Sequence, residues 1–114
     1  MLPKKFRLPP ENFDRVYKNG KKIRGQYGMF VCAESDMGNP RFGFVVSKKV
    51  GGAVLRNRMT RLLRVTVMEV VNEKNMGGLN LDFQYIAFKF CNKKTDLKRE
   101  VQFQLQDALK IFDE

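Results

Sequence analysis

The residues in this sequence that are best suited to chemistry are arginines and lysines able to bind phosphate groups. Segment 41–64 contains seven Lys or Arg residues and no Asp or Glu. If 53–74 is a helix, residues four apart share a face, and the polar residues after position 55 fall into two lines. These are the 56/60/64 line (Arg56, Thr60 and Arg64) and the 57/58/61 line (Asn57, Arg58 and Arg61). One helix could therefore contact two phosphate-bearing partners.

A turn that contains glycine precedes this helix. Lys48 and Lys49 are followed by Gly51 and Gly52. Free backbone N–H groups at a helix N-terminus attract anions, and two adjacent lysines strengthen that attraction. The G-x-x-x-x-G-K-[ST] spacing of a nucleotide-binding P-loop is missing, so the turn favours the phosphates of a polynucleotide backbone.

Catalytic residues are harder to find. The chain has no His and only two Cys, Cys32 and Cys91, which we predict to be buried free thiols. Common Cys/His zinc sites and His-based acid–base catalysis are thereby excluded. If the chain itself is an enzyme, the alternative to a protein that only binds phosphates, we would expect a nuclease that works without RNA and binds metal through Asp14, Glu34 or Asp36. These acids form no motif, and we expect them on the solvated surface.

Length and charge narrow the class of protein. We predict that the 114 residues form one domain, 1–114, and the formal net charge of +10 favours nucleic acid or an anionic membrane surface as the partner. No apolar run approaches the ~20 residues of a membrane-spanning helix, and MLPKKFRLPP lacks the apolar segment of a signal peptide. We therefore expect a cytoplasmic protein with no membrane partner.

The elements that must position the basic residues can be predicted from periodicity. We expect a basic extended arm over 1–9, a short helix over 11–17, a basic turn at 21–24 and strands over 26–34, 41–47 and 82–90. The long helix over 53–74 has an apolar stripe, and a last helix runs from about 95 to 112. The stripe of the long helix consists of Leu55, Met59, Leu62, Leu63, Thr66 and Val70.

The order of these elements is α-β-β-α-β-α. This order predicts an α/β (α+β) fold with a central mixed sheet of three or four strands and helices packed on it. Because only residues 35–40 separate the first two strands, we expect those strands to pair antiparallel.

The run SKKVGGAVLRNRMTRLLR, residues 47–64, resembles the signature of the bacterial ribonuclease P protein subunit. FRLPPENFDRVYKNG before it and D-x-x-Y-I-A-F-K after it have the family's order and spacing, so the resemblance covers nearly the whole chain. It implies a left-handed βαβ crossover, whereas such connections are right-handed in about 98% of cases.

The resemblance also implies a function. The protein would be an accessory to a catalytic RNA that removes the 5′ leader from precursor tRNA, and Mg²⁺ bound by that RNA would activate the attacking water. The residues that match the family's RNA-subunit contacts are Lys48, Lys49, Asn57, Arg58 and Arg61. The residues that match its leader contacts are Phe13, Tyr17, Phe30, Arg56, Thr60 and Arg64. No obligate protein partner is implied.

Three of these positions differ from the family's pattern or allow two interpretations. The family usually has Lys or Arg at position 60, so Thr60 departs from that pattern at one of the expected phosphate contacts. Phe13 and Tyr17 share a helix face with Val16, and the residues alone assign them to the core. The resemblance instead places them beside a cleft for single-stranded RNA, where aromatic rings stack on bases.

A competing hypothesis is a ribosomal or other structured-RNA-binding module that has no role in tRNA processing. Such a module would have the same basic helix and the same expected sheet as a ribonuclease P protein. Sequencing the RNA that co-purifies with the protein would distinguish the two, since one predicts ribonuclease P RNA and the other ribosomal RNA.

Overall fold

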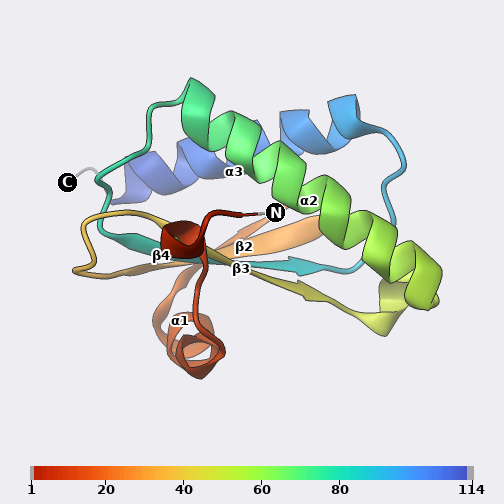
Figure 1. Cartoon of the computed structure of the whole chain (residues 1–114), viewed down its shortest axis with the longest axis horizontal. Helices are drawn as coiled ribbons and strands as arrows, with labels where there is room; N and C mark the ends of the chain where they lie inside the picture. Colours follow the sequence, from red (N-terminus) through yellow and green to blue (C-terminus); the bar gives the residue numbers. More distant parts are fainter. Residues whose placement is uncertain (1, 113–114) are drawn as a thin grey trace.

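A four-stranded sheet lies between helices on its two faces in the computed structural model, which describes residues 2–112. Figure 1 shows α2 and α3 above the sheet and α1 below it. The strands are β1 (Lys21–Arg24), β2 (Gly28–Glu34), β3 (Arg41–Val46) and β4 (Leu81–Ala87), and the helices are α1 (Phe13–Asn19), α2 (Ala53–Glu73) and α3 (Lys94–Ile111). The predicted small α+β fold with a mixed sheet is confirmed.

Strand order differs from the prediction that β2 and β3 pair. The order is β1-β2-β4-β3, and β4 pairs antiparallel with β2 and parallel with β3. β4 is apolar or buried on both faces and therefore takes a central position. The connection over 35–40 needs to span only about 10 Å, two strand spacings, which is well within its reach at about 3.3 Å per residue.

The predicted basic turn at 21–24 is also wrong, because Lys21–Arg24 forms the edge strand β1, paired antiparallel with β2. Charged side chains suit an edge strand, since they discourage pairing with other chains. Their charge masked the strand pattern in the sequence. On the other side of the sheet, β3, α2 and β4 form a parallel βαβ unit whose handedness stays a prediction.

The main core lies between the sheet and helices α2 and α3. Met59, Leu63, Thr66 and Val70 of the predicted stripe are fully buried, whereas Leu55 and Leu62 are half-buried. The helix phase was therefore predicted correctly, and α2 turns its opposite face to solvent. Cys32 and Cys91 are buried free thiols, as predicted.

The N-terminal arm is docked on the sheet rather than fully extended. Leu2 and Leu8 are buried, and Lys4–Phe6 forms a 3-10 turn. The backbone N–H of Leu8 donates to the carbonyl of Phe42 at 2.9 Å, so the arm covers part of the β3 edge. The predicted helix over 11–17 is a 3-10 turn, Pro10–Asn12, followed by α1.

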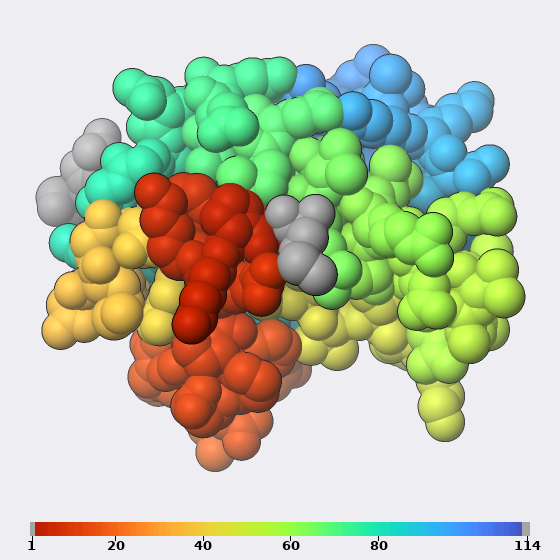
Figure 2. Space-filling view, in the orientation of Figure 1, coloured from red at the N-terminus to blue at the C-terminus, as the bar shows by residue number. Residues whose placement is uncertain are grey.

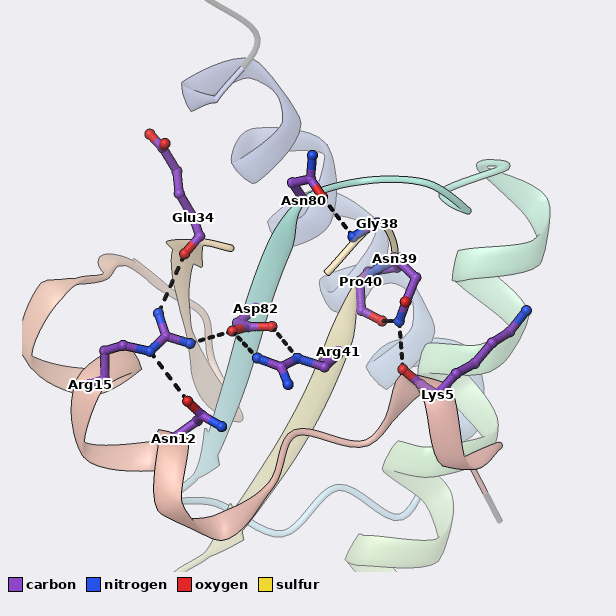
Figure 3. A network of polar contacts seen from close by, with 10 residues as sticks. All are labelled: Lys5, Asn12, Arg15, Glu34, Gly38, Asn39, Pro40, Arg41, Asn80 and Asp82. Atoms are coloured by element: carbon purple, nitrogen blue, oxygen red, sulfur yellow. Dashed lines mark hydrogen bonds and ion pairs between the residues drawn. The ribbon is translucent and has the colours of Figure 1, made fainter. Parts of the chain in front are cut away.

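A buried charge network fastens α1 to the sheet (Figure 3). Asp82 of β4 is fully buried and accepts from Arg41 of β3 through Nε at 2.8 Å and Nη2 at 2.7 Å. Arg15 of α1 forms an ion pair with the same carboxylate. The hydrogen bond to Asp82 raises the pKa of Arg41 above its ordinary value. One carboxylate thus joins α1, β3 and β4.

Candidate RNA-binding site

The two polar lines of α2 occupy different surroundings. Asn57, Arg58 and Arg61 are exposed, and within residues 2–112 neither arginine of this line forms an ion pair. The residues of the 56/60/64 line are half-buried, and two of them, Thr60 and Arg64, line a groove at the β3 edge. The helical spacing that separated the lines in the sequence separates them in space as well.

In the part of the chain that the structure describes, no side chain caps the N-terminus of α2. Its N-cap is Gly52, its first turn contains no acid, and Lys48 and Lys49 just before it are exposed. Gly51 has a φ of 143°, a conformation that favours glycine. The free N–H groups of the first turn and the two exposed lysines thus lie within a few residues of the exposed line of α2.

A groove of about 280 Å³ runs along the β3 edge between the N-terminal arm, α1 and α2. Its lining consists of Leu2, Arg7, Leu8, Phe13, Phe42, Gly43, Phe44, Thr60 and Arg64. The ring of Phe13 packs against Gly43 so closely that a Cβ added there would lie 2.4 Å from its Cζ. Because Gly43 has no side chain, Phe13 can approach β3 this closely and line the groove.

Below the sheet, α1 covers only part of the face. Val16 packs on Val31 and Ala33, and the next row of the same face is half-buried. We call this row, Met29, Val45 and Ile86, the open sheet face; its members are in register across β2, β4 and β3. Figure 2 shows the surface hollowed between α1, in red-orange, and the turn before α2, in yellow-green. Tyr17 of α1 is 45% exposed.

The family model described as Ribonuclease P matches residues 2–110. The chain belongs to the ribonuclease P protein family. The protein component of Bacillus cereus strain AH187 is 34% identical over 104 residues, which cover 88% of each chain. That of Syntrophomonas wolfei is 40% identical over 70 residues, 60% of this chain and 59% of that protein.

Solved structures of the family agree with the fold. The ribonuclease P protein of Staphylococcus aureus has a TM-score of 0.64 at 29% identity, covering 93% of this chain and 94% of that one. The protein from Thermotoga maritima has a TM-score of 0.63 at 25% identity, covering 93% and 96%. As a ribonuclease P protein component, the chain takes part in tRNA 5′-leader processing and partners ribonuclease P RNA. The ribosomal alternative is thereby set aside.

Among the residues matched to the family's leader contacts, Phe30 is wrong as a direct RNA contact. It is fully buried on the helix-covered face, with its ring edge-on to Phe83 at 6.0 Å and to Tyr85 at 4.9 Å between centroids. Both neighbours in sequence, Met29 and Val31, are also apolar, so alternation could not show which face Phe30 occupies. Phe13 and Tyr17 are both partly exposed, as the family resemblance implied.

Sequence reasoning missed Arg7 and Phe44 in the groove. Arg7 belongs to an arm with no periodicity, and Phe44 appeared to be an ordinary strand residue. Thr60 of the same groove donates its hydroxyl to the Arg56 carbonyl at 2.8 Å, so this ribonuclease P family member offers no cation there. Arg64 supplies the charge on α2 at this point.

The donor set for a divalent cation is lacking in the part of the chain that the structure describes. No three His, Cys, Asp or Glu side chains in residues 2–112 lie close enough together to hold a metal ion, and Asp14, Glu34 and Asp36 form no such group. These residues therefore do not fit Mg²⁺.

Within residues 2–112, no helix has both the length and the apolar character needed to cross a membrane.

Proposed function

We propose that α2 holds two different RNAs on its two polar lines. The 57/58/61 line, with Lys48 and Lys49, binds the ribonuclease P RNA subunit. The 56/60/64 line, with Phe13 and Tyr17, binds the 5′ leader of precursor tRNA. The observation that carries this proposal is the difference in surroundings. The first line is exposed and its arginines form no ion pair within residues 2–112, whereas the second line is half-buried and its Thr60 and Arg64 line the β3 groove.

The leader is single-stranded RNA, and the surface beside α1 has what such RNA needs. Exposed aromatic rings stack on unpaired bases, and each base stacked is worth about 1–3 kcal/mol. Tyr17 offers such a ring, and Phe13 presents part of its ring in the groove beside Arg64. Leader nucleotides therefore lie along the open sheet face and pass the β3 edge.

Grip and placement are the protein's contributions, and the chemistry belongs to the RNA. We propose that Mg²⁺ is bound by the RNA subunit, since the described residues offer no carboxylate cluster for it. The holoenzyme acts in the cytoplasm. The direct test is reconstitution: the protein should restore cleavage of precursor tRNA by a bacterial ribonuclease P RNA at low magnesium. Absence of any rescue would contradict the proposal.

Binding of the RNA subunit should depend less steeply on salt in the Arg58→Ala, Arg61→Ala double variant. Each neutralised phosphate contributes roughly −0.7 to −0.9 to the slope of log K against log salt, so we expect the slope to flatten by about one to two units. Filter binding of the RNA subunit over a salt series measures it. The matched control, Arg99→Ala with Lys110→Ala, removes two exposed charges from α3. An equal change in both variants would contradict the assignment.

Arg64→Ala should weaken binding of precursor tRNA about fivefold to tenfold, because a charge-assisted contact to a phosphate is worth about 1–1.5 kcal/mol when half-exposed. Binding of mature tRNA should not change. Thr60→Lys should tighten leader binding modestly, since it adds a cation to the groove. Titration of both RNAs against the reconstituted holoenzyme measures the ratio of affinities. Arg61→Ala is the control one helix face away, and it should leave that ratio unchanged.

A further inference from the structure

Strand β1 places two cations over two aromatic rings beside the open sheet face. Lys22 and Arg24 are in register with Val31 and Met29, so both lie on the α1 side of the sheet. The Nζ atom of Lys22 is 4.7 Å from the ring centroid of Tyr17. The guanidinium carbon of Arg24 is 4.7 Å from the ring centroid of Phe88.

Both cations are accessible. Lys22 and Arg24 are exposed, Phe88 is half-buried, and neither cation forms an ion pair within residues 2–112. The guanidinium of Arg24 is planar, and an RNA base can stack on the side of it that Phe88 does not cover. A cation that forms no ion pair within the protein, such as Lys22 or Arg24, can in addition bind the phosphate group of the nucleotide whose base lies beside it.

The alternate residues of β1 give a contrast within one strand. Lys21 is in register with Cys32, which is buried in the core on the α2 and α3 side, so Lys21 belongs to the opposite face. Lys22 and Arg24 are two residues apart on one face, a separation of about 6.6 Å. At that separation the two side chains can bind two successive nucleotides of an extended single-stranded RNA.

We propose that β1 is the second wall of the leader cleft, and that the Lys22–Tyr17 and Arg24–Phe88 pairs bind two nucleotides of single-stranded RNA. The inference rests on the proposed function, which puts the leader on the open sheet face. The RNA subunit is held on the α2 side, so leader nucleotides near the cleavage site pass β3 first. Those that reach β1 lie further along the leader, about 14 Å across the sheet.

The test compares precursor tRNAs that have a short leader, unable to cross the sheet, with those that have a long leader. In the reconstituted holoenzyme, Lys22→Ala with Arg24→Ala should lower affinity for the long-leader precursor about tenfold. Affinities for the short-leader precursor and for mature tRNA should stay unchanged. Phe88→Leu keeps both charges and removes one ring, and it should reproduce a severalfold part of the loss.

The control is Lys21→Ala with Arg99→Ala, which removes two exposed cations from other surfaces of the protein. An equal loss in this control would overturn the inference, because net charge alone would then explain the effect. Full retention of the long-leader preference in both the Lys22→Ala, Arg24→Ala double variant and the Phe88→Leu variant would also overturn it. If the wild-type holoenzyme binds precursor and mature tRNA equally, the proposed leader site itself fails.

Discussion

Asp82→Asn should lower the free energy of unfolding by about 3–5 kcal/mol, the usual cost of removing one partner from a buried ion pair. The carboxylate is fully buried and compensates two guanidinium groups, those of Arg15 and Arg41. Asparagine keeps the size of the side chain but carries no charge, so Arg41, whose side chain is 11% exposed, would lose its ionic partner in a largely buried position. Urea unfolding followed by circular dichroism measures the change.

An exposed ion pair is the control for this prediction. Lys98 of α3 pairs with Glu73 of α2, and both side chains are in contact with solvent. Glu73→Gln should leave the urea midpoint nearly unchanged, because exposed pairs contribute little. A similar shift in Asp82→Asn and Glu73→Gln would mean that the network is not buried as described.

The network also connects stability with leader binding. Arg15 is the contact of α1 with Asp82, and α1 carries Phe13 and Tyr17. A helix of seven residues has little stability of its own and depends on tertiary contacts. Loss of the Asp82 charge should therefore disturb the groove before it disturbs the 57/58/61 line, which lies on α2.

The features that the sequence predicted well are local. The phase of α2 follows from apolar residues at three- and four-residue intervals, and the same phase separates Arg58 and Arg61 from Arg56 and Arg64. For the other helices, turn residues and glycines in the sequence predicted the ends to within a few residues of those in the structure. Local patterns can therefore place basic side chains in two separate lines on one helix without any knowledge of the sheet.

The features of the fold that could not be predicted from the sequence depend on contacts between distant segments. β4 enters between β2 and β3 because it can be buried on both faces, and no short-range signal shows that choice. The Arg24–Phe88 pair forms because the side chain of Arg24 in β1 meets that of Phe88, the residue after β4, and the two are 64 residues apart in the sequence. The side taken by Phe30 depends on which face of β2 is covered by α2 and α3.

Phe30→Ala should lower the free energy of unfolding by about 3–5 kcal/mol, because it removes a fully buried ring from between Phe83 and Tyr85. Phe30→Leu keeps most of the volume and should cost less, about 1–1.5 kcal/mol. Neither change should alter the ratio of affinities for precursor and mature tRNA in protein that remains folded. Urea unfolding and tRNA titration of the holoenzyme give the two readings.

For Tyr17→Ala, on the other side of the sheet, we expect the reverse of the Phe30 result: a small effect on stability and a large effect on RNA binding. Its ring is 45% exposed, so its loss should leave stability within about 1 kcal/mol and reduce the preference for precursor tRNA severalfold. If Phe30→Leu changes that preference while Tyr17→Ala does not, the open sheet face is not where the leader binds. If Phe30→Ala melts like the wild type, the ring is not part of the core. The two aromatic residues thus test the two faces of β2 independently.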